Sequence, residues 1–115
     1  MKDWNAYRSQ VSGRIGEFAE LSPDVVAGMR KIGGSASKTG HLEPKVHELI
    51  ALAVAVTTRC DGCIASHTKA AVEYGASREE IAEALGVAVA LNAGAAAVYS
   101  ARVLDACAAL PAVSK

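Results

Sequence analysis

The residues best suited to chemistry are a cysteine pair, Cys60 and Cys63, and a histidine four residues further on, His67. On a helix, residues three or four apart share a side, so the two thiols lie within disulfide-forming range after a small adjustment. Backbone N–H groups and the dipole at a helix start stabilise a thiolate, which is the reactive form of cysteine. His67 can accept the thiol proton or pair with the thiolate. The spacing therefore predicts redox chemistry at this dithiol.

A carboxylate upstream of the pair, Glu48, extends this arrangement. On one continuous helix the 12 residues from Glu48 to Cys60 would span about 18 Å, which excludes contact. If the chain instead reverses near Thr57-Thr58, facing positions have numbers that add up to about 115, and Glu48 faces His67. A carboxylate in that place would orient the imidazole and raise its basicity, as the third member of a catalytic triad does.

Two other interpretations of the cysteine pair stay open at this point. The pair could be half of a zinc site, or Cys60, Cys63 and His67 could supply three zinc ligands; four ligands are usual. The remaining candidates are few, because Cys107 is the only other cysteine and His41 and His47 are the only other histidines. The pair could also be two small buried residues with a structural role.

The elements that must position these residues are predicted to be about six helices. Twenty-four alanines against five aromatic residues favour closely packed helices over strands. The helices are expected over about 3–20, from 22 to the glycines at 33–34, from 43 through the apolar stretch 49–56, over 60–74, from 77 to a break at 92–94, and from there to about 110.

Helix-end signals support these boundaries. Ser22 with Pro23 suits a helix start, and Ser77 with Glu80 forms a capping box. Gly75 suits a helix end. The connection 33–42 is read as a plain linker in preference to a substrate channel or subunit contact.

Burial follows from the apolar pattern. The first helix has one apolar face, and the helix containing 49–56 is apolar all round, which predicts a central buried helix. The helix from 77 is expected to bury Ile81, Leu85, Val89 and Leu91. Cys107 lies among alanines and is expected in the core.

Length, charge and composition limit the function classes. The 115 residues fit one domain, and the formal net charge is zero without a basic stripe, so nucleic-acid and membrane-surface binding lack electrostatic support. The longest unbroken apolar run, 49–56, is too short to span a bilayer, and the first residues do not form a signal peptide. We therefore expect a cytoplasmic protein. In that compartment a close cysteine pair is more often catalytic or metal-binding than a structural disulfide.

Glu48, the Cys60-x-x-Cys63 pair and His67 together resemble the signature of the AhpD-like branch of the carboxymuconolactone decarboxylase family. The sequence around these residues is similar to that family too, and the resemblance covers about residues 42–104. It includes the segments 47–56, 64–71, 75–88 and 92–94.

The resemblance implies a single all-helical domain over 1–115 that assembles into a homotrimer or homohexamer, with no cofactor or metal. It implies an alkylhydroperoxidase-type activity in which Cys63 attacks the peroxide and Cys60 resolves the product as a disulfide. Glu48 and His67 form the proton relay, and an external thiol restores the pair. The alternative function belongs to a different class: a redox-sensing or partner-binding module that uses the same dithiol without fast turnover.

The residues between the cysteines depart from some relatives, which carry bulkier or histidine residues there. Asp61 places a negative charge near the thiols, which opposes thiolate formation and predicts weaker peroxidase activity. The decarboxylase branch of the family lacks the cysteine pair, which disfavours its reaction here.

Overall fold

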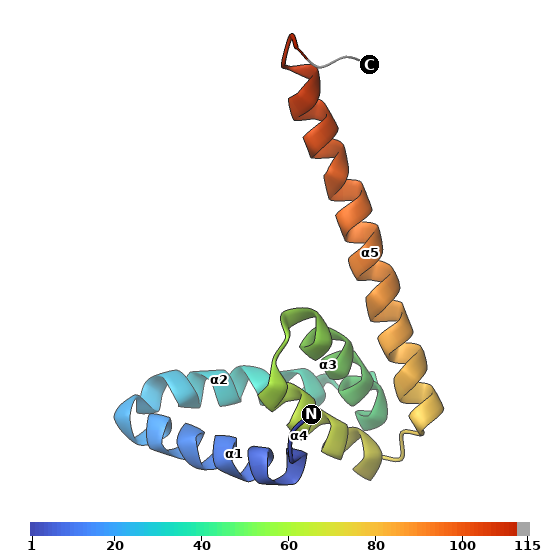
Figure 1. The fold of residues 1–115 in the computed structure, drawn as a ribbon. Helices are drawn as coiled ribbons and strands as arrows, with labels where there is room; N and C mark the ends of the chain where they lie inside the picture. The colour runs from blue at the N-terminus through green and yellow to red at the C-terminus, as the bar shows by residue number, and fades with distance from the viewer. Residues whose placement is uncertain (113–115) are drawn as a thin grey trace.

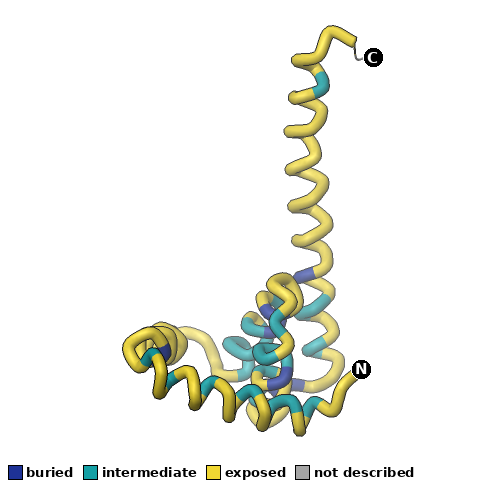
Figure 2. Tube along the Cα trace, turned by 60° about the vertical axis from the view of Figure 1, so that its left-hand side comes forward, coloured by how far each residue is buried: buried dark blue, intermediate teal, exposed yellow. Residues whose placement is uncertain are grey.

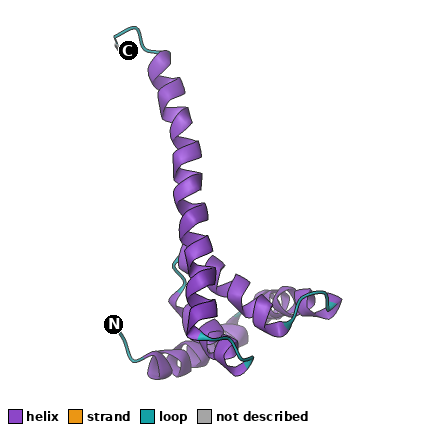
Figure 3. Cartoon of the chain, turned by 90° about the vertical axis from the view of Figure 1, so that its right-hand side faces the viewer, coloured by secondary structure: helices purple, strands orange, loops and turns teal. Residues whose placement is uncertain are grey.

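The computed structural model describes residues 1–112, and within that range the protein is all-α. The helices are α1 (Trp4–Leu21), α2 (Pro23–Ser35), the short 3-10 helix η1 (Ala36–Thr39), α3 (Pro44–Thr58), α4 (Asp61–Glu73) and α5 (Arg78–Ala108) (Figure 1). The all-helical prediction is confirmed. The first four α-helices lie together, whereas α5 projects away from them for most of its length (Figures 1 and 3).

The helix ends predicted at Ser77 and Gly75 are present. The Ser77 hydroxyl accepts from the Glu80 backbone N–H and the Glu80 carboxylate accepts from the Ser77 N–H, which completes the capping box of α5. Gly75, with φ of 88°, follows α4 in the left-handed conformation that glycine adopts without steric cost. Lys45 pairs with Glu80 at 2.8 Å, so the first turn of α5 is tied to the first turn of α3.

The chain reverses between α3 and α4 at Arg59. This residue has φ of 57° and is the one non-glycine residue with positive φ in the described chain. The Ala55 carbonyl accepts hydrogen bonds from the backbone N–H groups of Arg59 and Cys60, which closes α3. The hairpin predicted at Thr57-Thr58 therefore exists, with its apex one residue later.

The core sits where α3 meets α4 and α5. Leu52, Ala71 and Ala76 are buried there, and Leu49, Ile81 and Leu85 pack against them. The central position predicted for α3 is therefore right. The prediction that it is buried all round is wrong for the single chain, because Ile50 and Val54 are exposed. Much of the chain lies at the surface (Figure 2).

The break predicted at 92–94 is wrong, so the described chain has five α-helices and not six. Asn92 stays in the helix because its amide donates to the Ala88 carbonyl (2.7 Å) and to the Thr57 hydroxyl (2.9 Å). A glycine inside a helix costs only about 1 kcal/mol relative to alanine, and Gly94 is surrounded by strong helix formers. The result is a single helix of 31 residues.

The burial predicted for this region is also wrong beyond Ala88. Val89 and Leu91 are 67% and 66% exposed, and Cys107 is partly buried but does not lie in the core. An 18-residue window of α5 has a mean hydropathy of 1.7, and 6% of it is buried. α5 is long and apolar enough to cross a membrane, judged by length and composition alone. A helix that is buried against other parts of a protein can have the same length and composition.

The left-handed residue at the hairpin apex gives a stability prediction. A side chain in this conformation costs about 1–2 kcal/mol, which glycine avoids. We expect Arg59→Gly to melt about 4 °C above Arg59→Ala at equal protein concentration, measured by circular dichroism. The alanine variant controls for loss of the arginine side chain, and equal midpoints would contradict strain at the apex.

Candidate redox site

Cys60 and Cys63 lie where the chain enters α4. Cys60 is the N-cap residue, and its sulfur accepts a hydrogen bond from the Cys63 backbone N–H at 3.1 Å. The two cysteines are joined as a disulfide with a Cα–Cα distance of 5.2 Å. The Cys60 sulfur therefore occupies the place where a capping oxygen usually sits, within the positive field of the helix start. In the reduced protein the same contact favours the thiolate of Cys60.

Glu48 on α3 and His67 on α4 are in direct contact, as the hairpin spacing predicts. The Glu48 Oε2 atom lies 2.6 Å from the His67 Nδ1 atom. The carboxylate side chain is 17% exposed and the imidazole 41% exposed. An ionised carboxylate can only accept, so His67 donates from Nδ1 and presents the lone pair of Nε2 for proton transfer.

A cavity of about 510 Å³ opens beside this pair, between η1, α3 and α4. Glu48 and His67 line it together with His47 and Tyr74, and apolar side chains such as Leu42 and Ile50 complete the wall. Neither this cavity nor the presence of His47 in its wall was predicted from the sequence, which gave His47 only as a remaining candidate zinc ligand. The only available signal was the position of His47 next to Glu48.

The connection 33–42 contributes to the same cavity through Gly33, Ala36, Ser37 and Leu42. It is partly helical, because α2 continues to Ser35 and η1 follows. The plain-linker interpretation of this segment is therefore too simple. Its small residues leave room in front of Glu48 and His67.

The other candidate residues lie apart from this group. Cys107 is a free cysteine near the end of α5, and His41 is an exposed loop residue. Within residues 1–112, no three histidine, cysteine or acidic side chains are grouped as metal ligands would be. The zinc interpretation therefore gains no support from the described part of the chain.

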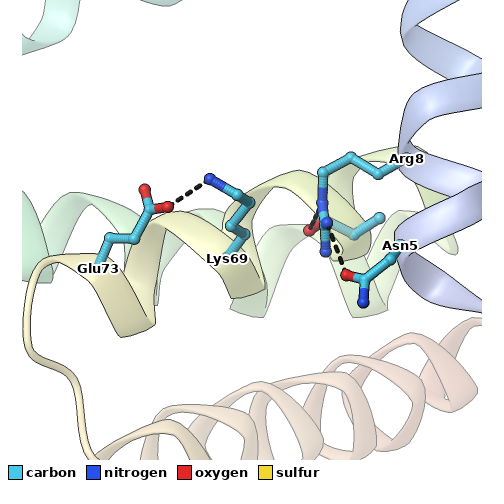
Figure 4. Close-up of polar contacts among 5 residues, drawn as sticks. Asn5, Arg8, Lys69 and Glu73 are labelled. Atoms are coloured by element: carbon cyan, nitrogen blue, oxygen red, sulfur yellow. Dashed lines mark hydrogen bonds and ion pairs between the residues drawn. The ribbon is translucent and has the colours of Figure 1, made fainter.

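Helix α1 lies against the outer side of α4. The Arg8 side chain donates from Nε to the Ala65 carbonyl at 3.0 Å, and a second guanidinium nitrogen bonds the Asn5 amide oxygen at 3.0 Å (Figure 4). Further along α4, Lys69 and Glu73 form an ion pair one turn apart. The Arg8–Ala65 bond ties α1 to α4, whereas the Arg8–Asn5 bond lies within α1 and the Lys69–Glu73 pair within α4.

Comparison with known proteins places these features in a family. The sequence profile of the carboxymuconolactone decarboxylase family matches residues 23–106. A Haemophilus influenzae protein of unknown function is 47% identical over 104 residues, which cover 90% of this chain and 92% of that protein. An uncharacterised protein from the cox locus of Paracoccus denitrificans is 33% identical over 95 residues, covering 83% and 86%.

A solved structure is similar as well. It is the crystal structure of the apo form of a carboxymuconolactone decarboxylase family protein from Legionella pneumophila. The TM-score is 0.73 with 33% sequence identity, and the match covers 92% of this chain and 95% of the other.

The disulfide gives a direct prediction about thiol accessibility. In oxidised, unfolded protein we expect iodoacetamide to add to Cys107 alone, because the other two cysteines are bridged. After reduction all three cysteines should be alkylated, and intact mass spectrometry counts the additions. Three additions before reduction would contradict a Cys60–Cys63 bridge in the oxidised protein. Added zinc at equal concentration, which should leave the count after reduction unchanged, is the control for metal protection.

Proposed function

The chain belongs to the carboxymuconolactone decarboxylase family, and we propose that it is a thiol-dependent peroxidase of the AhpD-like kind that reduces alkyl hydroperoxides through Cys60 and Cys63. The observation that carries the proposal is the 2.6 Å contact between Glu48 of α3 and His67 of α4, the helix that starts at the cysteine pair. The two cysteines supply the electrons, and the His67 imidazole accepts and supplies protons.

The reaction begins with reduced cysteines. His67 removes the Cys63 proton, and the thiolate attacks the terminal oxygen of the hydroperoxide. The S–O bond forms while the O–O bond breaks, and the leaving alkoxide takes the proton from the imidazolium of His67 to become the alcohol. Cys63 is left as a sulfenic acid. Glu48 keeps the imidazole oriented and stabilises its charged form.

Closure of the disulfide completes the oxidative half. His67, neutral again, takes the proton of Cys60, and the Cys60 thiolate attacks the sulfenic sulfur. The S–S bond forms, the S–O bond breaks, and the departing hydroxide takes that proton from His67 and leaves as water. Two electrons and two protons from an external thiol reductant reopen the bridge. The N-cap position of Cys60 supports its role as the resolving thiol, because the Cys63 N–H stabilises its anion.

The cavity supports an organic hydroperoxide as the substrate. Its volume of about 510 Å³ is typical of a small-molecule site, and its wall is mainly apolar. Leu42 and Ile50 offer apolar contact to a hydrocarbon chain, and Glu48 and His67 form a polar part of the wall; neither cysteine is among the lining residues, so the peroxide group would have to reach past His67 to meet Cys63. Hydrogen peroxide would use none of this apolar wall.

We also propose that the protein works as a homo-oligomer, a trimer or hexamer, in the cytoplasm. The single chain exposes 8913 Å², whereas a monomeric protein of 11.8 kDa exposes about 5,900 Å². Its radius of gyration of 19.3 Å exceeds the value of about 13 Å for a compact chain of this length. The excess of about 3,000 Å² is the size of an obligate subunit interface.

The outer part of α5 is the main apolar surface available for that interface. Val98, Tyr99, Val103 and Leu104 are 63–76% exposed along it. Apolar residues on several sides of an isolated helix need cover from protein or lipid. Neighbouring copies with the same apolar helix provide that cover.

The peroxidase proposal is tested with substitutions at the site. With cumene hydroperoxide and dithiothreitol we expect Cys63→Ser to abolish turnover and Glu48→Gln to lower kcat/KM about tenfold to hundredfold. Cys60→Ser should still consume one equivalent of peroxide and leave a sulfenic acid that dimedone traps. Cys107→Ser is the matched control and should retain full activity.

Two outcomes would reject this assignment. Unchanged turnover in Cys63→Ser would exclude Cys63 as the attacking thiol. A wild-type rate constant no greater than that of free cysteine, together with a partner bound only in the oxidised form, would favour redox sensing instead.

The oligomer is tested by sedimentation velocity. We expect the wild type to sediment at three or six times 11.8 kDa, and the double variant Val98→Glu, Leu104→Glu to dissociate because charges cannot be buried in an apolar interface. Lys31→Glu, an exposed charge change on α2, is the control and should leave the assembly intact. A monomeric wild type, or one recovered only in membranes, would overturn the proposal.

A further inference from the structure

Lys2, before the first helix, reaches the centre of the cysteine motif. Its Nζ atom lies 2.7 Å from the Oδ2 atom of Asp61, the residue that follows Cys60. The same ammonium lies 4.0 Å from the Tyr7 ring centroid and 5.5 Å from the Trp4 centroid. The two rings meet edge to face at 6.0 Å. The aromatic pair therefore holds the lysine in place over the carboxylate.

The Lys2–Asp61 contact is the first of three that join α1, or the residues just before it, to the first part of α4. A Cβ atom on Gly62 would meet the Val11 side chain at 3.5 Å, so α1 packs directly over the residues between the cysteines. Arg8 bonds the Ala65 carbonyl one turn further along. Residues 1–22 precede the region that the family profile matches. The cover over the motif is thus built by a part of the chain outside that region.

We propose that Lys2 is a positioning residue that neutralises Asp61 and thereby raises the thiolate content and reactivity of the reduced Cys60–Cys63 pair. It acts through Asp61 and not on the substrate. The inference concerns the site of the proposed peroxidase, but thiol reactivity is measurable without any peroxide.

The Asp61 carboxylate is close to both sulfurs because Asp61 lies between the two cysteines in the sequence. Backbone and side-chain dimensions keep its carboxylate within about 10 Å of both sulfurs, comparable to the screening length of about 8 Å at physiological salt. Unpaired, that charge opposes a thiolate and competes with it for the positive field at the start of α4. An ammonium ion at 2.7 Å converts the single charge into a compact ion pair, whose field falls off faster with distance.

Lys2 is the cation suited to this role. The hydrogen bond to Asp61 raises the pKa of Lys2 above its ordinary value, so it stays charged wherever the thiols titrate. Of the other charges near the start of α4, Arg8 bonds the Ala65 carbonyl and Asn5, and Glu48 bonds His67. Arg59, next to Cys60, is exposed and forms no ion pair with Asp61, whose carboxylate is paired with Lys2. The pair is partly exposed, at 37% for Lys2 and 48% for Asp61, so its effect is moderate and sensitive to salt.

The test measures alkylation of the reduced protein by iodoacetamide at pH 7, in a Cys107→Ser background so that only the motif cysteines react. We expect Lys2→Gln to slow alkylation about threefold, the effect of one charge at about 7 Å under water-like screening. Lys2→Arg should restore the rate, and 1 M NaCl should reduce the difference. Asp61→Asn should react at least as fast as the parent.

The double variant Lys2→Gln, Asp61→Asn decides the mechanism. If Asp61 is what holds the lysine at the motif, removing the lysine from the Asp61→Asn protein has no further effect, because without the carboxylate the ammonium no longer stays near the thiols. The same threefold loss in both backgrounds, or no loss in either, would overturn the inference. Lys45→Gln, which removes a lysine from a similar exposed pair with Glu80, is the matched control and should leave the rate unchanged.

Failure of this inference is distinct from failure of the proposed function. Loss of the Lys2 effect with peroxidase turnover intact would remove the inference alone. A Lys2 effect on alkylation in a protein that consumes no peroxide would support it while rejecting the peroxidase. Circular dichroism of each variant checks that α1 remains folded.

Discussion

The reversal of the chain between α3 and α4 is the constraint on which the site depends. Arg59 takes up a left-handed conformation, and Cys60 then begins the next helix. This turn places Glu48 beside His67, although 19 positions separate them in sequence, and puts the cysteine pair at a helix start. A longer connection would allow other registers between the two helices. The tight apex allows only one register between the two helices. A few residues therefore determine both the Glu48–His67 contact and the electrostatic surroundings of the two cysteines.

Small side chains make this hairpin possible and also limit the core. Ala55, Ala65 and Ala71 are buried where the helices approach one another, and alanine allows close backbone contact. Alanine, however, buries little apolar area, so the single chain gains little from its own core. The larger apolar residues lie on the outside, along α5 and on the free side of α3. The close packing that positions the site and the exposed apolar surface of the single chain therefore have the same origin.

Local signals in the sequence predicted the elements that position the site, and contacts distant in sequence account for what was missed. Ser77, Glu80 and Gly75 act within one turn, so their roles were readable without the fold. The Glu48–His67 contact followed from spacing because the hairpin is short. Asn92 was read as a break, since its bond to Thr57 requires knowing that α5 crosses α3. Burial of Val89 was predicted from periodicity, which reports that a face is apolar but not whether this chain covers it.

The start of α4 brings together two groups that compete for its positive field, the Cys60 sulfur and the Asp61 carboxylate, and one cation, Lys2, that adds to it. The Cys60 sulfur accepts the Cys63 N–H, Asp61 occupies the first helical position, and Lys2 approaches from the chain terminus. From the sequence alone Asp61 had only an unfavourable effect on the thiols. With Lys2 in contact, the carboxylate also gives α1 an ionic attachment point on the motif. In the role proposed for Lys2, the effect of this charge on the thiols depends on the contact between Lys2 and Asp61. The packing of Val11 over Gly62 attaches the motif to α1 as a whole and not to one exposed lysine alone.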